Sequence, residues 1–201
     1  EDEQELLINA GELINRYDLL SSEEMAECLP PALKQHEQGI NCVEGRVSDL
    51  AFSQTGTRVA IAGEKHIVIW DFGKDCPDHA RKIKTYWDFE KVVGYVAFTL
   101  DGHLLCSEGR KHGRPSKLHI WSDSEFRIPW ENNITSIHGI GPTKALVTGR
   151  DGFIHIVNTE DGVIEETREL PSWPRSSCVD IPSGQALVGG EGVYLIDLSD
   201  L

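Results

Sequence analysis

The feature that most constrains this chain is an internal repeat, which begins near residue 40 and continues to the C-terminal end. Each unit has the order strand, tight turn, strand, short loop, strand. In the first unit the three strands are residues 47–53, 57–63 and 66–71, and the tight turn is residues 54–56. Apolar residues alternate along them with the period of two that half-buried strands show. Units of this kind, spaced by about 40–45 residues, predict a fold built from small repeated sheets.

The same order of segments returns in three further units, at residues 93–122, 134–158 and 177–197. When the third strands are aligned, one column holds Trp70, Trp121, Val157 and Ile196. The positions one and three residues before this column are aliphatic in every unit. A shared column over four units is much stronger evidence for a repeat than any one motif.

Strand-like segments also precede the units, at residues 40–43, 82–87, 126–130 and 163–170. We interpret them as outer strands, which give each unit a fourth strand. The segment near residue 42 could complete the last sheet. The chain is therefore predicted to be all-β, with four-stranded antiparallel sheets over residues 39–201.

These units resemble the WD-repeat β-propeller family. In the first unit Phe52-Ser53, Gly56 and the segment 67–71, which ends in Trp70-Asp71, match the strands of that family. The second unit keeps Ile120-Trp121 and has Ser122 where Asp is usual, whereas the last two units lack the Trp. The resemblance covers about residues 40–201. It implies that each unit is one blade of a propeller and that the protein works by holding other proteins.

Four blades raise the question of how the ring closes, because WD-repeat propellers commonly have about six to eight blades. Three explanations remain open. The chain belongs to a larger ring whose other blades lie elsewhere in a longer protein, or it pairs with itself or with a partner, or it closes alone as a four-bladed ring. An open propeller exposes apolar blade faces and strand edges, which is costly.

Residues 1–38 differ from the rest, with 10 acidic and 2 basic side chains and little Gly. Leu6, Ala10, Leu13, Tyr17 and Leu20 follow one another by steps of 4, 3, 4 and 3 residues, which place them on one helix face and predict a helix. Ser21 begins a capping-box pattern, which predicts a second helix at residues 22–29. We interpret residues 1–38 as a short α-helical domain that either packs on the propeller or docks another subunit through Leu6, Leu13, Tyr17 and Leu20.

Charge and cysteine content limit the function. The formal net charge of −14 disfavours direct binding to nucleic acid. No apolar run is long enough to span a membrane, and no signal peptide is visible. The cysteines are odd in number and widely spaced, which argues against a disulfide framework or a zinc site and favours an intracellular location, in the cytoplasm or nucleus; they are Cys28, Cys42, Cys76, Cys106 and Cys178.

A search for catalytic motifs gives no enzyme signature, so we expect neither catalysis nor a cofactor. His119 and His155 share a column on neighbouring units, but we interpret them as structural rather than as metal ligands. The glycine-rich segment 139–144 faintly resembles a phosphate loop. Pro142 removes an amide donor there, and we interpret the segment as a turn between two strands.

One cluster of basic residues could bind a partner. The loops between second and third strands carry cations in three units and are expected on one face of a propeller; these residues are Lys65, Arg110, Lys111, His112, Arg114 and Arg150. Such a rim could recognise an acidic or phosphorylated segment. The main hypothesis is a non-enzymatic scaffold in a multiprotein complex. The alternatives are a reader of phosphorylated or acidic peptides and a regulatory propeller of a longer enzyme.

Overall fold

The computed structural model describes residues 4–10, 13–19, 40–41, 46–71, 81–86, 89–109 and 115–200. The chain divides into two compact units, residues 1–47 and 48–201. The predicted domain boundary after residue 38 lies among residues outside the described ranges, and it stays a prediction. In the described part of the chain, no helix has the length and apolar character that crossing a membrane requires.

The first unit contains three strands, β1 (Gln4–Ala10), β2 (Leu13–Leu19) and β3 (Ile40–Asn41). β1 and β2 form an antiparallel pair in which Leu6 lies opposite Tyr17. The helix predicted through Leu6, Leu13 and Tyr17 is therefore wrong for these two ranges. The steps of four, from Leu6 to Ala10 and from Leu13 to Tyr17, each fall within one strand, and an even step fits a strand face as well as a helix face. The step of three, from Ala10 to Leu13, leads from β1 to β2 and so did not reveal the strands. Leu20 and the predicted helix at residues 22–29 lie outside the described residues.

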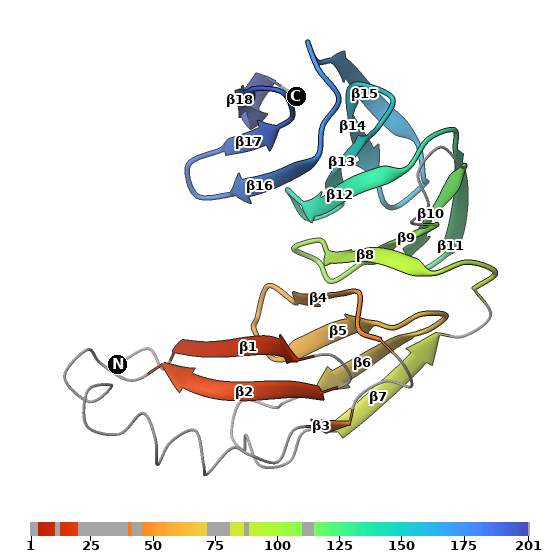
Figure 1. The fold of residues 1–201 in the computed structure, drawn as a ribbon, viewed down its shortest axis with the longest axis vertical. Helices are drawn as coiled ribbons and strands as arrows, with labels where there is room; N and C mark the ends of the chain where they lie inside the picture. The colour runs from red at the N-terminus through yellow and green to blue at the C-terminus, as the bar shows by residue number, and fades with distance from the viewer. Residues whose placement is uncertain are drawn as a thin grey trace. The chain divides into compact units, whose positions relative to one another are not determined.

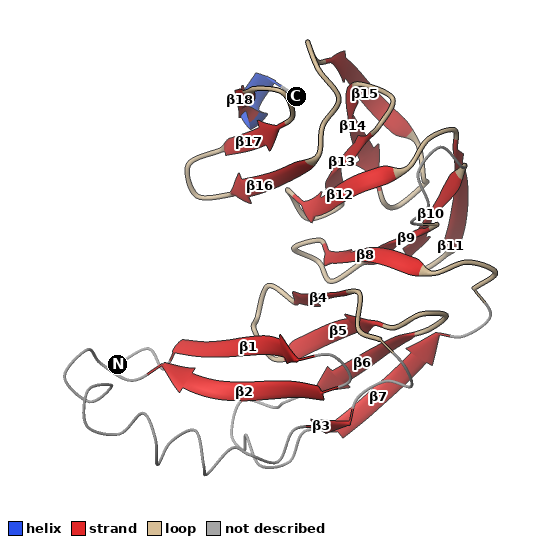
Figure 2. Cartoon of the chain, in the orientation of Figure 1, coloured by secondary structure: helices blue, strands red, loops and turns tan. Residues whose placement is uncertain are grey.

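The second unit consists of four antiparallel sheets over its described residues (Figure 2), and we refer to them as blades 1 to 4. Blade 1 contains β4 (Asp49–Phe52), β5 (Arg58–Ala62), β6 (Ile67–Asp71) and β7 (Arg81–Tyr86). Blade 2 contains β8 (Val93–Phe98), β9 (Leu104–Glu108), β10 (Ser116–Trp121) and β11 (Glu125–Trp130). Blade 3 contains β12 (Ile134–Gly139), β13 (Lys144–Gly149), β14 (Phe153–Asn158) and β15 (Ile164–Glu169). Blade 4 contains β16 (Ser176–Asp180), β17 (Gln185–Gly189) and β18 (Val193–Asp197), followed by the 3-10 helix η2 (Leu198–Asp200).

This topology confirms the predicted all-β propeller fold, in which consecutive strands of a blade are neighbours. Figure 1 shows β4, β8, β12 and β16 toward the middle of this unit, and β7, β11 and β15 at its periphery. Each of these outer strands pairs with the third strand of its own blade, which comes directly before it in the sequence. The segment at 40–43 could have completed blade 4, but Ile40–Asn41 pair with β2, and residues 42–43 lie outside the described ranges. Blade 4 has three strands among the described residues.

The register of the strands confirms the aligned column. Trp121 lies opposite Leu104, Val157 opposite Ala145, and Ile196 opposite Ala186. Equivalent residues of the blades can therefore be compared directly. The segment 139–144 forms the turn between β12 and β13, as predicted.

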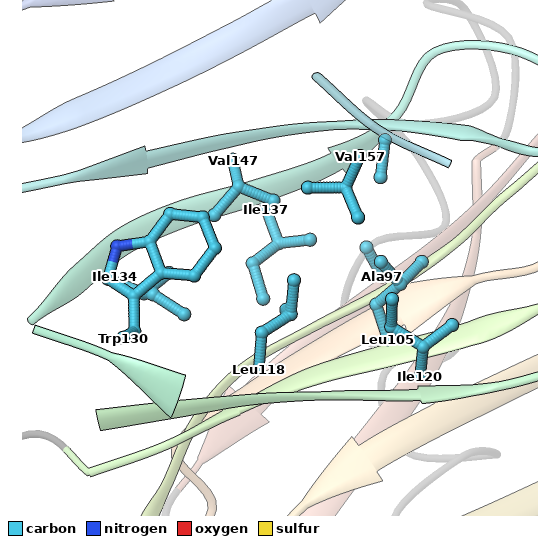
Figure 3. Packing of buried hydrophobic residues seen from close by; sticks show 10 residues of the cluster. Ala97, Leu105, Leu118, Ile120, Trp130, Ile134, Ile137, Val147 and Val157 are labelled. Carbon is cyan, nitrogen blue, oxygen red and sulfur yellow. The ribbon is translucent and has the colours of Figure 1, made fainter. Parts of the chain in front are cut away.

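Aliphatic side chains pack between each blade and the next. Between blades 2 and 3, Leu105, Leu118 and Ile120 point toward Ile137, Val147 and Val157 (Figure 3), and all six are at most 4% exposed. The next core is built in the same way from Leu146, Ile154 and Ile156 of blade 3 and from Ala186, Val188 and Ile196 of blade 4. Both faces of an inner blade are apolar, which explains why its strands are so rich in Val, Ile and Leu.

We expect the cores between blades to govern stability. Ile156→Val removes one buried methylene at a site that is 1% exposed, which should lower the free energy of unfolding by about 1 kcal/mol. The matched control is Ile164→Val on β15, where the side chain is exposed, and the change should stay within about 0.5 kcal/mol. Urea unfolding followed by tryptophan fluorescence measures both. Equal losses in the two variants would contradict this assignment of the core.

Candidate functional site: the loop rim

The inner strands of the four blades line one cleft of about 400 Å³. Its walls come from β4, β8 and β12 and from Arg175–Ser177 at the start of β16. Hydrogen bonds join the inner strands across this cleft: the Val96 N–H donates to Asp49 Oδ2 at 2.9 Å, and the His138 ring shares a hydrogen bond of 2.9 Å with the Ser177 carbonyl oxygen. Burial lowers the pKa of His138, against the raising effect of that carbonyl group. A neutral ring that donates Nε2–H to the carbonyl fits both observations.

A second cleft of about 340 Å³ opens among loops of blades 3 and 4. We call it the rim cleft. It lies where the turn between β13 and β14, the connection between β15 and β16, and the turn between β17 and β18 come together. Its lining residues are Asp151, Gly152, Glu169, Leu170, Pro171, Ser172, Trp173, Arg175 and Glu191.

Asp151 fixes the β13–β14 side of the rim cleft. Its carboxylate accepts hydrogen bonds from Trp130 Nε1 at 3.1 Å and from the Phe153 N–H at 3.0 Å, and it lies 3.3 Å from His155 Nε2. Burial alone would raise the pKa of Asp151, but the hydrogen bonds from His155 and Phe153, the His155 charge and the Trp130 hydrogen bond lower it below its ordinary value. These contacts therefore hold an ionised carboxylate in a defined position in the turn.

Ser172 and Gly190 fix the opposite side. Ser172 Oγ accepts the Glu191 N–H at 3.1 Å and lies 3.1 Å from the Tyr194 hydroxyl. A Cβ atom at position 190 would lie 2.5 Å from Ser172 Oγ and 2.7 Å from the Trp173 carbonyl oxygen. Only glycine allows this close approach between the two segments.

Trp173 is the most conspicuous group in the rim cleft. Its side chain is 69% exposed, although the backbone that carries it is held by the contacts of Ser172 and Gly190. Glu169 and Glu191 are also exposed, and Arg175 is the basic residue in the lining. An exposed indole beside carboxylates can hold an apolar side chain or a cationic one. Trp173 could not be predicted from the sequence, because a tryptophan in a loop gives no periodic signal.

The predicted basic residues are described only in part. Lys65 lies in the loop between β5 and β6, and Arg150 lies in the turn between β13 and β14; both are exposed. Arg150 is next to Asp151 in the sequence and so borders the rim cleft. The others, Arg110, Lys111, His112 and Arg114, lie outside the described residues. The proposed recognition of an acidic segment stays a prediction.

The two histidines of the shared column have different partners. His119 Nε2 lies 2.8 Å from Glu108 Oε2, and both side chains are at most 4% exposed. The other oxygen of Glu108 accepts the Lys91 N–H at 2.9 Å. His155 bonds to Asp151 and, at 3.0 Å, to Thr167 Oγ1. Each ring therefore joins strands or turns within its own blade, in line with the structural interpretation.

Two cysteines lie within the described residues. Cys106 is fully buried in β9, and burial together with the nearby Glu108 charge raises the pKa of its thiol. It therefore behaves as the small hydrophobe expected of an apolar strand. Cys178 on β16 is exposed. Cys28, Cys42 and Cys76 lie outside the described ranges.

Comparison with known proteins identifies one informative relative. No family model matches the chain. The ciliary WD repeat-containing protein ctxp80 of Euplotoides octocarinatus is 30% identical over 139 residues, which cover 65% of this chain and 18% of that protein. The chain thus spans less than a fifth of the relative's length. WD-repeat propellers in general mediate protein–protein interactions and are in general not enzymes.

Proposed function

We propose that this chain, whose blades resemble those of WD-repeat β-propeller proteins, is a non-enzymatic scaffold that holds other proteins within a multiprotein complex. Fold alone says little about function, since unrelated functions use the same architecture. The proposal therefore needs a surface that can bind a partner. The rim cleft is that surface, and the exposed Trp173 is the single observation that carries the proposal.

Trp173 has the properties of a binding hot spot. Tryptophan is enriched among residues that dominate interface energies, because it offers a large rigid contact area at little entropic cost. The hydrogen bonds of Ser172 and the close approach of Gly190 hold the backbone around it. Because this backbone is already ordered, binding costs little further conformational entropy, which favours affinity.

The charges around the indole indicate the kind of segment that fits. Asp151, Glu169 and Glu191 place three carboxylates in the lining, against the one guanidinium of Arg175. A partner segment with an apolar side chain beside a Lys or Arg would meet both the ring and the carboxylates. A location in the cytoplasm or nucleus is part of this proposal.

Replacing the indole should weaken partner binding. We expect Trp173→Ala to raise the Kd of a co-purified partner on the order of tenfold or more, because the ring is the largest exposed group in the rim cleft. Titration by isothermal calorimetry or biolayer interferometry measures this. Thermal unfolding should hardly change, since the ring is mostly solvated.

The matched control is Ile164→Ala, another exposed apolar residue, on the outer strand β15. It should bind the partner like the wild type. If Trp173→Ala binds as tightly as Ile164→Ala, the rim cleft is not the partner site.

A further inference from the structure

Arg175 lies where the two clefts of the second unit meet. We call the cleft of about 400 Å³ between the inner strands the central cleft. Among the described residues, Arg175 is the one that lines both the central cleft and the rim cleft. A single partner segment bound at the rim cleft can therefore reach the central cleft past this side chain.

The backbone that carries Arg175 is fixed. Its N–H donates to the Gly189 carbonyl oxygen at 2.7 Å, and the preceding Pro174 is buried. Two residues before Arg175, Trp173 is held by the close approach of Gly190. Because two residues span at most about 7 Å of chain, the indole and the guanidinium start from neighbouring, ordered positions.

The Arg175 guanidinium has no acidic partner among the described residues. Arg175 is exposed and takes part in none of the ion pairs in that part of the chain. The nearby carboxylate of Asp151 is already bonded to Trp130 and Phe153. A guanidinium binds carboxylates through paired, charge-assisted hydrogen bonds, and here its charge is available to an acidic group of a ligand.

A chain of hydroxyl groups supplies a further donor in the central cleft. Hydrogen bonds join Thr135 to Thr148, Thr148 to Ser136, and Ser136 to Ser177. Each hydroxyl has one hydrogen to donate, so the three hydrogen bonds leave one of the four hydrogens unused. Thr148 is fully buried, and an unused donor there would be costly. The unused hydrogen therefore belongs to one of the other three residues, all of which line the central cleft.

The other charged groups of the two clefts favour a carboxylate over a phosphate. Asp49, on β4, lines the central cleft, and three further carboxylates line the rim cleft. Arg175 is the one guanidinium among them, and the His138 ring is neutral when it donates Nε2–H to the Ser177 carbonyl oxygen. A phosphate carries roughly two negative charges at neutral pH, so it would meet more repulsion here than a carboxylate with its single charge.

We propose that Arg175 selects partner segments that carry an acidic side chain close to the residue held at Trp173. The carboxylate enters the central cleft and binds the guanidinium and the unused hydroxyl hydrogen. The cation of the same segment lies against the carboxylates of the rim cleft. An extended segment advances by about 3.3 Å per residue, which places the acidic residue about two to four residues from the one at Trp173. The inference rests on the proposed function, because it requires a partner at the rim cleft.

A displayed library of random linear peptides, selected on the full chain, supplies the probe. Peptides whose binding depends on Trp173 should carry Asp or Glu about two to four residues from a Lys, Arg or apolar residue. For a synthetic copy of such a peptide, Arg175→Gln should raise the Kd on the order of tenfold, and Arg175→Lys should restore part of the affinity. The melting temperature should hardly change, since the side chain is exposed. The matched control, Arg127→Gln, removes the same charge at an exposed position on β11 and should bind like the wild type.

A double-mutant cycle separates direct recognition from a change in shape. Replacing the acidic residue of the peptide by its amide should cost as much affinity as Arg175→Gln, and the two changes together should cost little more than either one. Additive losses, or tighter binding of a peptide with phosphoserine at that position, would overturn the inference. If Trp173→Ala weakens the peptides and Arg175→Gln does not, the inference fails and the proposed function stands. If no selected peptide depends on Trp173, both fail.

Discussion

Gly139→Ala should destabilise the propeller by about 3 kcal/mol or more, the typical upper range for steric overpacking. A Cβ atom at position 139 would lie 2.0 Å from the carbonyl oxygen of Phe98 and 2.7 Å from the Cα of Thr99. Both atoms belong to the backbone, so no side chain can turn aside to make room. One of the two blades must move.

That movement would break further contacts between blades 2 and 3. The Leu100 N–H donates to the Gly141 carbonyl oxygen at 3.0 Å, and the Asp101 N–H donates to that of Pro142 at 3.3 Å. These hydrogen bonds hold the turn after β8 against the turn after β12. They depend on the close approach that Gly139 permits.

Gly141→Ala is the matched control, two residues away in the same turn. A Cβ atom there meets only the Lys144 Cβ, at 3.6 Å, which is an ordinary van der Waals distance. Urea unfolding should therefore show a large fall in the free energy of unfolding for Gly139→Ala and little change for Gly141→Ala. Similar midpoints for the two variants would mean that the blades approach each other differently from this structure.

Removing the Glu108 carboxylate should have the second large effect. We expect Glu108→Ala to lower the free energy of unfolding on the order of 3 kcal/mol at neutral pH. The variant leaves the buried His119 ring and the Lys91 N–H without their acceptor, and it opens a cavity beside the fully buried Ser107 and Cys106 strand. Glu108→Gln keeps the side-chain volume and one acceptor oxygen, so its free energy of unfolding should fall markedly less.

The pH dependence follows from the pKa values of this pair. Burial alone would raise the pKa of Glu108, but the Lys91 N–H, the His119 hydrogen bond and nearby positive charge lower it below its ordinary value. Ionised Glu108 therefore stabilises the fold above the ordinary glutamate pKa, and this stabilisation is lost as the pH falls through the lower folded value. Burial lowers the pKa of His119, against the raising effect of Glu108, so protonation of this ring also opposes folding.

Stability of the wild type should thus fall as the pH drops below about 6.5, where an unfolded histidine begins to bind protons, and further below the ordinary glutamate pKa. The difference in melting temperature between the wild type and Glu108→Gln should become smaller over the acidic part of that range, because the wild-type carboxyl group then becomes neutral too. Thermal melts from pH 7.5 to about 3.5 measure this. A difference in melting temperature that stays constant with pH would show that Glu108 stabilises the fold by its packing and not by its charge.

Much of the fold could be predicted from local pattern. Strand alternation has a period of two wherever one face is buried, so the third strands around Trp70, Trp121 and Val157 were found with their register. Pro142 and the glycines beside it likewise marked the turn between β12 and β13. At residues 6–19 the same approach failed, because the apolar residues there fit both periods and the strand pairing of β1 with β2 is what distinguishes them.

The site was far less predictable. Trp173, Asp151 and Glu191 lie in three separate loops, and only the packing of blade 4 on blade 3 brings them together in the rim cleft. The predicted basic rim was read from single residues in equivalent loops. The comparison of units could not show that the rim cleft itself would be lined by Asp151, Glu169 and Glu191 beside Arg175.

By itself, the sequence determined the strands, the turns and the repeat of residues 47–197, because alternation, glycine and the spacing of units are local properties of the chain. The tertiary structure decided which blade faces are covered. Leu146 and Leu187 occupy equivalent positions in equally apolar strands, yet one is fully buried and the other is 44% exposed. No local pattern distinguishes them, since burial depends on whether a neighbouring blade is present.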